Sequence, residues 1–125
     1  MGMQRVLVVD DNRDSADSLV TAFSVLGHEA VAAYGGREAL ARIDDAKPSL
    51  IVLDLSMPEM DGYALARAIR ALPAYAAVPM VALSGFGSEA DRTKSREAGF
   101  DRHMLKPFDL GDLERMVDLV DTGAR

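Results

Sequence analysis

The chain has 125 residues, of which 49% are apolar and 27% are charged, and it contains no cysteine. This size and composition are typical of one soluble globular domain, and the lack of cysteine excludes disulfides and thiolate metal sites. The net charge of -6 argues against nucleic acid as a direct partner, because there is no basic surplus to neutralise phosphates. No apolar run is long enough to span a membrane, and the N-terminus does not resemble a signal peptide. We therefore expect one cytoplasmic domain over residues 1–125, with its core over about residues 4–121.

Five short apolar runs recur along the chain. They are Val6–Val9, a weaker run at Ala30–Ala33, Leu50–Leu53, Met80–Leu83 and His103–Leu105. Continuous apolar runs, as opposed to alternating ones, are typical of strands that are covered on both faces, as in parallel sheets.

Segments of helical periodicity lie between these runs. Four of them carry an apolar stripe, whose members are Ala16, Leu19, Val20, Phe23 and Leu26; Ala39, Leu40 and Ile43; Leu65, Ala66 and Ile69; and Leu110, Leu113, Val117 and Val120. The first helix has a plausible N-cap at Asn12 or Asp14 and ends at Gly27. Residues 88–98 have the length of a helix but almost no large apolar side chain. The alternation predicts an α/β fold, a doubly wound (βα)5 parallel sheet with helices on both faces.

Polar side chains follow four of the five predicted strands. Asp10 and Asp11 follow the first, Asp54 the third, Ser84 the fourth and Lys106 the fifth. In such sheets ligands bind outside the carboxyl ends of the strands, so we expect these residues to meet at one edge.

The set carries the chemistry of phosphoryl transfer. Three neighbouring carboxylates repel one another unless a cation is present, and magnesium prefers oxygen ligands and commonly shares its shell with a phosphate. Asp54 is then a possible nucleophile that forms an acyl phosphate. Lys106 can neutralise the incoming phosphoryl oxygens, and Ser84 can donate a hydrogen bond to one of them. Taken singly, each residue is more simply a turn former, a helix cap or a surface residue, but their joint occurrence in this order favours the functional interpretation.

Four motifs make this sequence resemble the receiver domains of response regulators in two-component signalling, over nearly its whole length. The matching stretches are Val8-Val9-Asp10-Asp11-Asn12, Leu53-Asp54-Leu55-Ser56-Met57-Pro58-Glu59-Met60-Asp61-Gly62, Ala82-Leu83-Ser84-Gly85 and Leu105-Lys106-Pro107-Phe108. The resemblance implies a flavodoxin-like sheet with strand order 2-1-3-4-5. It also implies that the protein is not an enzyme toward other substrates, since a receiver catalyses only its own phosphorylation and dephosphorylation.

The resemblance assigns roles to individual residues. Asp54 matches the phosphoacceptor, which takes its phosphoryl group from a histidine kinase or a histidine phosphotransfer protein. Mg²⁺ or Mn²⁺ would be bound by Asp11 directly, by Asp10 through water, by Asp54 and by the backbone carbonyl of Ser56.

The resemblance also covers the switch. Ser84 matches the switch hydroxyl and Lys106 the active-site lysine, and the Lys106–Pro107 bond falls where the family has a cis peptide. Receivers of this kind act as monomers or as phosphorylation-dependent dimers on a downstream protein, which the sequence does not identify. We expect the signal to reach a surface formed by residues 88–98, the fifth strand and the last helix.

One position departs from the family. Receivers often have Tyr or Phe three residues before the lysine, where the ring changes rotamer on activation, and this chain has His103. The simpler interpretation is a histidine packed on an edge strand; the alternative is an imidazole that takes part in switching, with pH sensitivity. Ser56 and Phe86 occupy positions that tune the lifetime of the phosphoryl group in the family.

Three other kinds of protein share parts of this pattern. A haloacid-dehalogenase-like phosphatase needs a second Asp two residues after the nucleophile. This chain has Ser56 at that position after Asp54, and Asn12 at that position after Asp10. A flavodoxin-like cofactor carrier needs a phosphate loop after the first strand, and Asp10-Asp11 would repel a phosphate. A pseudo-receiver, acting only as an interaction module, would not need the full set of acids and lysine.

Overall fold

Five parallel strands form one sheet in the order β2-β1-β3-β4-β5. Their bounds are β1 (Arg5–Val9), β2 (Glu29–Ala33), β3 (Leu50–Asp54), β4 (Met80–Ser84) and β5 (Arg102–Leu105). The structure is a computed structural model that describes residues 2–55, 61–85, 89–106 and 109–122, with only the backbone described for residues 89, 90, 121 and 122. The predicted strands and the predicted strand order are confirmed.

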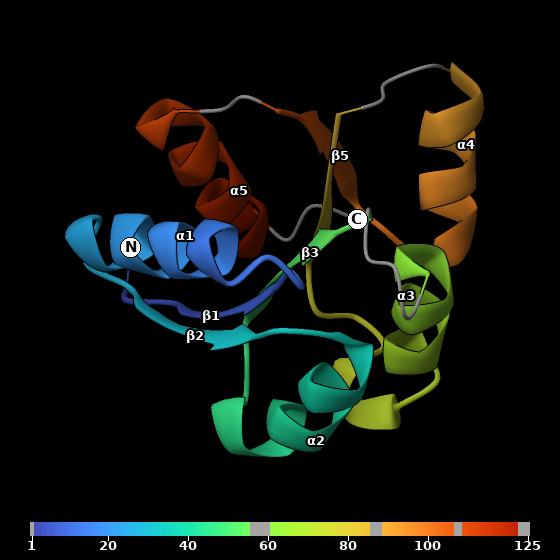
Figure 1. Cartoon of the computed structure of the whole chain (residues 1–125), viewed down its shortest axis with the longest axis horizontal. Helices are drawn as coiled ribbons and strands as arrows, with labels where there is room; N and C mark the ends of the chain where they lie inside the picture. Colours follow the sequence, from blue (N-terminus) through green and yellow to red (C-terminus); the bar gives the residue numbers. More distant parts are fainter. Residues whose placement is uncertain (1, 56–60, 86–88, 107–108, 123–125) are drawn as a thin grey trace.

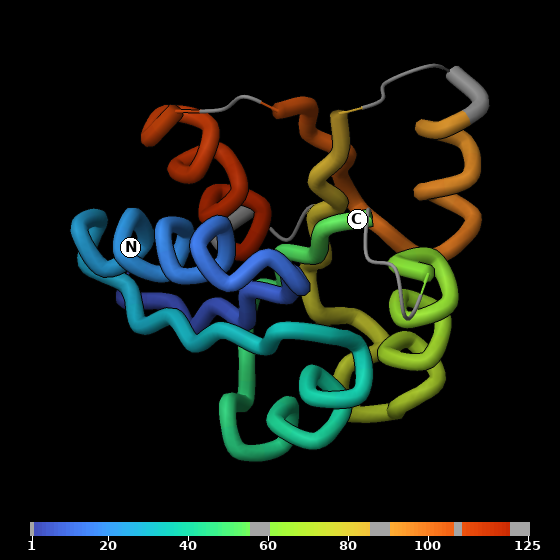
Figure 2. The backbone as a smooth tube through the Cα atoms, viewed as in Figure 1, coloured from blue at the N-terminus to red at the C-terminus, as the bar shows by residue number. Residues whose placement is uncertain are grey.

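Helices cover both faces of the sheet (Figure 1). They are α1 (Arg13–Val25), α2 (Gly36–Ala46), α3 (Gly62–Arg70), α4 (Glu89–Ala98) and α5 (Leu110–Thr122), with a short 3-10 helix η1 (Pro73–Tyr75). Helices α1 and α5 lie on one face, and α2, α3 and α4 lie on the other, as the backbone trace in Figure 2 also shows.

The helix ends follow from local chemistry. The side chain of Asn12 accepts a hydrogen bond from the Ser15 N–H at 3.0 Å, so Asn12 is the N-cap of α1 and Asp14 is not. After α1, Gly27 adopts a φ of 92°, a left-handed conformation that disfavours a side chain, and the helix stops there as predicted. One prediction was wrong: Leu110, placed in the apolar stripe of the last helix, is 47% exposed, whereas Met116 and Leu119 are buried. The buried stripe of α5 begins one turn later.

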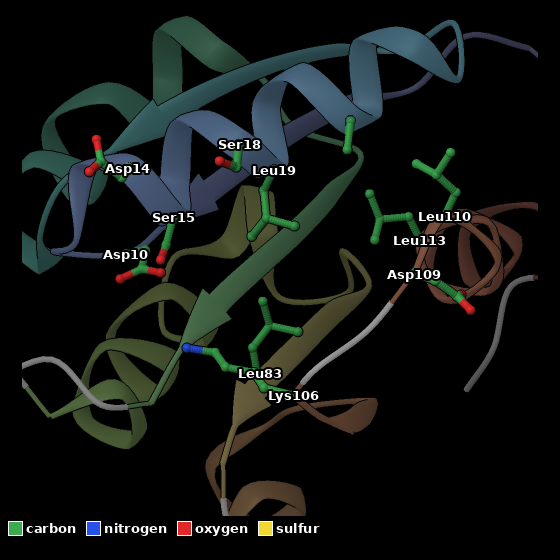
Figure 3. A pocket seen from close by; sticks show the side chains of 11 residues that line it. Asp10, Asp14, Ser15, Ser18, Leu19, Leu83, Lys106, Asp109, Leu110 and Leu113 are labelled. Atoms are coloured by element: carbon green, nitrogen blue, oxygen red, sulfur yellow. The ribbon is translucent and has the colours of Figure 1, made fainter.

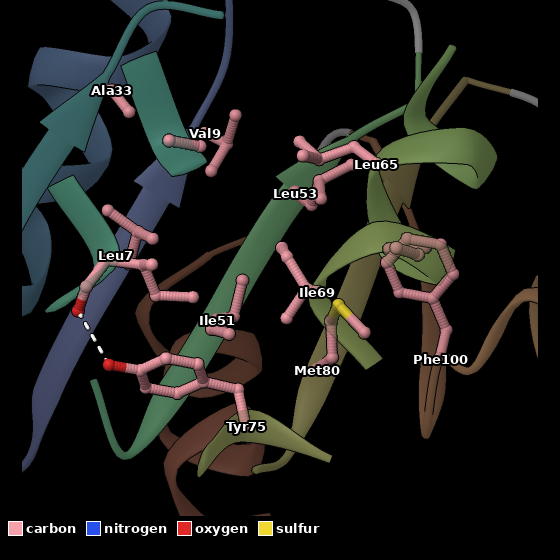
Figure 4. Packing of buried hydrophobic residues seen from close by; sticks show 14 of the residues in the cluster. Leu7, Val9, Ala33, Ile51, Leu53, Leu65, Ile69, Tyr75, Met80 and Phe100 are labelled. Atoms are coloured by element: carbon pink, nitrogen blue, oxygen red, sulfur yellow. Dashed lines mark hydrogen bonds between the residues drawn. The ribbon is translucent and has the colours of Figure 1, made fainter. Parts of the chain in front are cut away.

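The sheet separates two apolar cores. On one face, residues of β1, β3 and β4 pack against α2, α3 and η1, and the hydroxyl of Tyr75 donates to the Ile43 carbonyl at 3.2 Å (Figure 4). On the other face, the same strands pack against α1 and α5 around Phe23 and Met116, both fully buried. Strands β3 and β4 are buried along their whole length, whereas the edge strands β2 and β5 are partly exposed. The central strands therefore provide a rigid support for whatever follows their carboxyl ends.

Arg70, at the end of α3, joins the amino ends of β4 and β5. Its guanidinium donates to the carbonyls of Gly99 at 2.7 Å and Val78 at 2.6 Å, and it pairs with Asp101 at 3.0 Å. The same Asp101 carboxylate accepts a hydrogen bond from the Met80 N–H at 2.9 Å. These groups are mostly buried, so the network fixes the edge of the sheet opposite the predicted site.

Candidate functional site

The register of the parallel strands brings the predicted residues to one edge. Asp54 is the last residue of β3 and lies opposite Leu83, and Ser84 ends β4 opposite Leu105. Asp10 directly follows β1, and its N–H donates to the Ala33 carbonyl at 3.1 Å. Asp10, Asp54 and Ser84 are each no more than 3% exposed. Residues 74 positions apart in the chain, Asp10 and Ser84, thus end at the same rim.

An ion pair joins Asp54 to Lys106. The Lys106 Nζ donates to Asp54 Oδ2 at 2.6 Å, and the Asp54 side chain is only 4% exposed. The lysine is positioned by its own backbone, because the Lys106 N–H donates to the Ser84 carbonyl at 2.9 Å. A charge-assisted hydrogen bond of this length is stronger than one between neutral groups, so it holds the buried carboxylate in place.

Asp10 lies in a buried environment that disfavours its ionised form. Burial raises the pKa of Asp10 to about 6, and the charge of Asp54 adds to this, while the Asn12 backbone N–H and the Lys106 ammonium act in the opposite direction. The Asn12 N–H donates to Asp10 Oδ1 at 3.0 Å. The edge therefore holds more carboxylate than the neighbouring lysine neutralises, which is the condition under which a cation binds.

Close packing fixes the chain that leaves β3. The Leu55 N–H donates to the Leu83 carbonyl at 3.0 Å, and Gly62, at the start of α3, lies so near that an added Cβ would be 2.9 Å from the Leu55 Cα. Asp61 caps the helix by accepting a hydrogen bond from the Tyr63 N–H at 2.8 Å. The Asp61-Gly62 pair thus holds the start of α3 against the residue that follows Asp54.

A pocket between α1 and α5 opens on the acidic edge (Figure 3). Asp10 and Lys106 lie at one end of the pocket, and its walls are largely apolar, with Leu19 from α1, Leu83 from β4 and Leu113 from α5. The acidic edge is therefore open to solvent through the pocket between α1 and α5.

The remaining predicted residues are placed as follows. Asp11 is exposed beside Asp10. His103 lies away from the acidic edge, where its Nδ1 is 3.1 Å from the hydroxyl of Ser95 on α4. Ser56, Phe86 and Pro107 lie outside the described residues, as does the peptide bond between Lys106 and Pro107.

The donor chemistry fits a hard divalent cation. The described ligand candidates, Asp10, Asp11 and Asp54, offer only carboxylate oxygens, which Mg²⁺ and Mn²⁺ prefer. Among the residues that the structure describes, no three or more His, Cys, Asp or Glu side chains form a cluster that holds a metal ion by themselves. A metal here would complete its shell with water, phosphoryl oxygens or backbone oxygen, which is usual for magnesium.

The sequence interpretation missed Ser95. Ser95 is a polar residue of α4 that is only 1% exposed, and its partner His103 lies on β5. A small serine within a charged helix gives no periodic signal, so only the packing of α4 on β5 shows its role.

Residues 6–118 match the model of the response regulator receiver domain. The chain belongs to this family. Among curated relatives, the transcriptional regulatory protein PrrA of Mycobacterium leprae is 41% identical over 113 residues, which cover 90% of this chain and 48% of that protein. An uncharacterised 14.6 kDa protein of Leptolyngbya boryana is 37% identical over 112 residues, covering 90% of this chain and 86% of the relative. The receiver domain spans about half the length of the first curated relatives it matches.

Solved structures show the same fold. The chemotaxis protein CheY4 of Vibrio cholerae superposes with a TM-score of 0.90 at 28% identity, covering 95% of this chain and 99% of that one. The receiver domain of a histidine kinase from Syntrophus aciditrophicus superposes with a TM-score of 0.84 at 30% identity, covering 98% and 92%. In the described part of this receiver domain, no helix has the length and apolar character needed to cross a bilayer.

The raised pKa of Asp10 predicts a stabilising substitution. An aspartate in the unfolded chain titrates at about 3.9, so between that pH and about 6 the folded state binds the additional proton. Stability should therefore fall as the pH rises through this window, and the full penalty remains at higher pH. Asp10→Asn should raise the free energy of unfolding by roughly 1–3 kcal/mol at pH 7.5 in chelator, and by much less at pH 4.

Urea denaturation at both pH values measures this difference. Asp45→Asn, at an exposed aspartate of α2, is the matched control and should change stability by only a few tenths of a kcal/mol. An equal gain for Asp10→Asn at both pH values, or no gain at pH 7.5, would contradict the electrostatic account.

Proposed function

We propose that this receiver domain accepts a phosphoryl group on Asp54 from a histidine kinase or a histidine phosphotransfer protein, in a reaction that requires Mg²⁺ or Mn²⁺. The observation that carries the proposal is the buried Asp54 carboxylate, held 2.6 Å from the Lys106 ammonium at the carboxyl edge of the sheet. Asp10, Asp11 and the backbone carbonyl of Ser56 are the proposed protein ligands of the metal, together with Asp54. A bound metal would supply positive charge to the phosphoryl oxygens and to the acidic edge.

Asp54, Lys106 and Ser84 each have one role in the proposed phosphoryl transfer. A carboxylate oxygen of Asp54 attacks the phosphorus, a P–O bond forms as the P–N bond of the donor phosphohistidine breaks, and the electron pair of that bond stays on the imidazole nitrogen. Lys106 already contacts the Asp54 carboxylate, so its ammonium is in place to bind the phosphoryl oxygens without a large rearrangement. Ser84, buried at the end of β4, is the proposed donor to another of these oxygens.

The alternative functions fit less well. Asn12, which would have to be the general acid of a dehalogenase-like phosphatase, is an amide whose oxygen is engaged as the cap of α1. A flavodoxin-like phosphate loop would have to form beside Asp10, where the charge excess repels anions. A pseudo-receiver would have no use for the Asp54–Lys106 pair.

We also infer the location, the oligomeric state and the partners of the domain. A cytoplasmic location is expected, because the kinases that supply the phosphoryl group use ATP, which is available there. The domain would act as a monomer or as a phosphorylation-dependent dimer on a downstream protein, and it would catalyse only its own phosphorylation and dephosphorylation. Nucleic acid is not proposed as a direct partner of this domain, given its net charge of -6.

Phosphorylation of Asp54 is tested by intact-mass measurement. Incubation with acetyl phosphate and magnesium should add the mass of one phosphoryl group, and Asp54→Asn or excess chelator should abolish the addition. Asp45→Asn removes an exposed carboxylate elsewhere and should leave it unchanged. Equal uptake by the Asp54→Asn variant would assign the phosphoryl group to another residue.

The output would pass through α4, β5 and α5. Ser84 immediately precedes the segment that leads to α4, and α4 is tied to β5 by the contact between Ser95 and His103 at 3.1 Å. A phosphoryl group offers the Ser84 hydroxyl a charged acceptor, and this difference in contacts can shift α4 relative to β5. The Ser95–His103 contact would then be made in one state and altered in the other, which would give His103 a part in switching.

Hydrogen exchange with and without beryllofluoride, a phosphoryl mimic, tests this route. Protection should change in residues 84–103, and the change should shrink in Ser84→Ala. Ser95→Ala should raise the exchange of α4 before the mimic is added. Ser18→Ala, on the exposed side of α1, is the control. A change confined to the acidic edge, or one equally large in α1 and α2, would rule the route out.

A further inference from the structure

A small hollow between α4 and β5 has a lining rich in arginine. Its volume is about 160 Å³, and Arg92 and Arg96 of α4 line it together with Arg102 and His103 of β5. The three arginines are exposed, in a chain whose net charge is -6. Arg92 and Arg96 are four residues apart, so they project from the same side of α4, one turn from each other.

Asp101, the carboxylate that lines the hollow, is engaged by other groups. Asp101 pairs with Arg70 at 3.0 Å and accepts the Met80 N–H at 2.9 Å, so its charge is engaged by groups behind the hollow. In contrast, the surface of α1 carries Asp14 and Asp17, both exposed. The lining of the hollow is therefore positively charged, while two acidic residues of α4, Asp91 and the exposed Glu97, lie outside that lining.

The base of the hollow is well packed. Phe100 is 4% exposed and belongs to the core, and the Ser95 hydroxyl holds the His103 ring from α4. Arginine side chains on a rigid base are suited to planar carboxylates, which a guanidinium binds through two parallel N–H donors.

We propose that this hollow binds an acidic segment of a partner protein, with glutamate or aspartate side chains pairing with Arg96 and Arg102 and supported by Arg92. The inference names the chemistry of the partner for the output surface, and it rests on the proposed function in that respect. A short acidic segment can pair with Arg96 and Arg102 within the hollow. A long polyanion such as nucleic acid would extend beyond the hollow and meet the negative charge of the rest of the domain.

The test uses the full chain and a labelled glutamate-rich peptide, with a peptide of the same length in which glutamine replaces glutamate as the control probe. Fluorescence anisotropy, with and without beryllofluoride, measures binding. Exposed ion pairs are weak, so Arg96→Ala and Arg102→Ala should each weaken binding roughly two- to fivefold, and the double variant about tenfold. Arg37→Ala and Arg67→Ala, at exposed arginines of α2 and α3, should leave binding unchanged.

Other outcomes overturn the inference. Equal losses for the α4–β5 variants and the Arg37 or Arg67 variants would mean non-specific attraction. Concentration-dependent dimerisation that Arg96→Ala abolishes, with no peptide binding, would make a second copy of the chain the occupant, and tighter binding of a DNA oligonucleotide than of the peptide would make it a nucleic acid.

The two proposals fail separately. A chain that takes up the phosphoryl group on Asp54 but binds no peptide in either state overturns the docking inference and leaves the proposed function standing. Peptide binding that depends on Arg96 and Arg102 in a chain that takes up no phosphoryl group supports the docking site and counts against the proposed function.

Discussion

Two buried carboxylates, Asp10 and Asp54, lie beside the single ammonium of Lys106 at the carboxyl edge of the sheet. This excess of negative charge is the feature on which the chemistry of the site depends. The lysine is committed to Asp54 at 2.6 Å, and burial raises the pKa of Asp10 to about 6. A fold gains no stability from such an arrangement, because each buried carboxylate has lost its hydration. The arrangement is explained by the proposed function, in which a divalent cation would offset the excess negative charge and would, with Lys106, hold the anionic phosphoryl group.

The rest of the fold supports this edge. Strands β1, β3 and β4 are buried between two cores, so their carboxyl ends are held at fixed positions with respect to one another. Arg70 and Asp101 join the opposite ends of β4 and β5. Strand β4 ends with Ser84, and Lys106 directly follows strand β5. The Arg70 network therefore anchors the two strands that position the hydroxyl and the lysine.

Much of this could be predicted from the sequence, because it depends on local patterns. The apolar runs defined the strands, and the parallel arrangement then required Asp10, Asp54, Ser84 and Lys106 to meet at one edge, which the structure confirms. The exposed Leu110 was misplaced because a helical stripe does not reveal where the helix first meets the sheet.

The Ser95–His103 contact and the Arg70 network could not be predicted. Each joins residues from different elements, and single serine, histidine and arginine residues carry no periodic signal of burial. The sequence placed both Asp10 and Asp11 after the first strand, but it could not show that the side chain of Asp10 is buried whereas that of Asp11 is exposed.

The central claim is that Asp54, and no other carboxylate of the edge, becomes the acyl phosphate. Borohydride reduces an acyl phosphate to an alcohol, so reduction after phosphorylation should convert the modified aspartate to homoserine, and peptide mass spectrometry then identifies its position. The account predicts homoserine at position 54, formed only when both magnesium and the phosphodonor are present. Homoserine at position 10 or 11, or its formation in the presence of chelator, would contradict it.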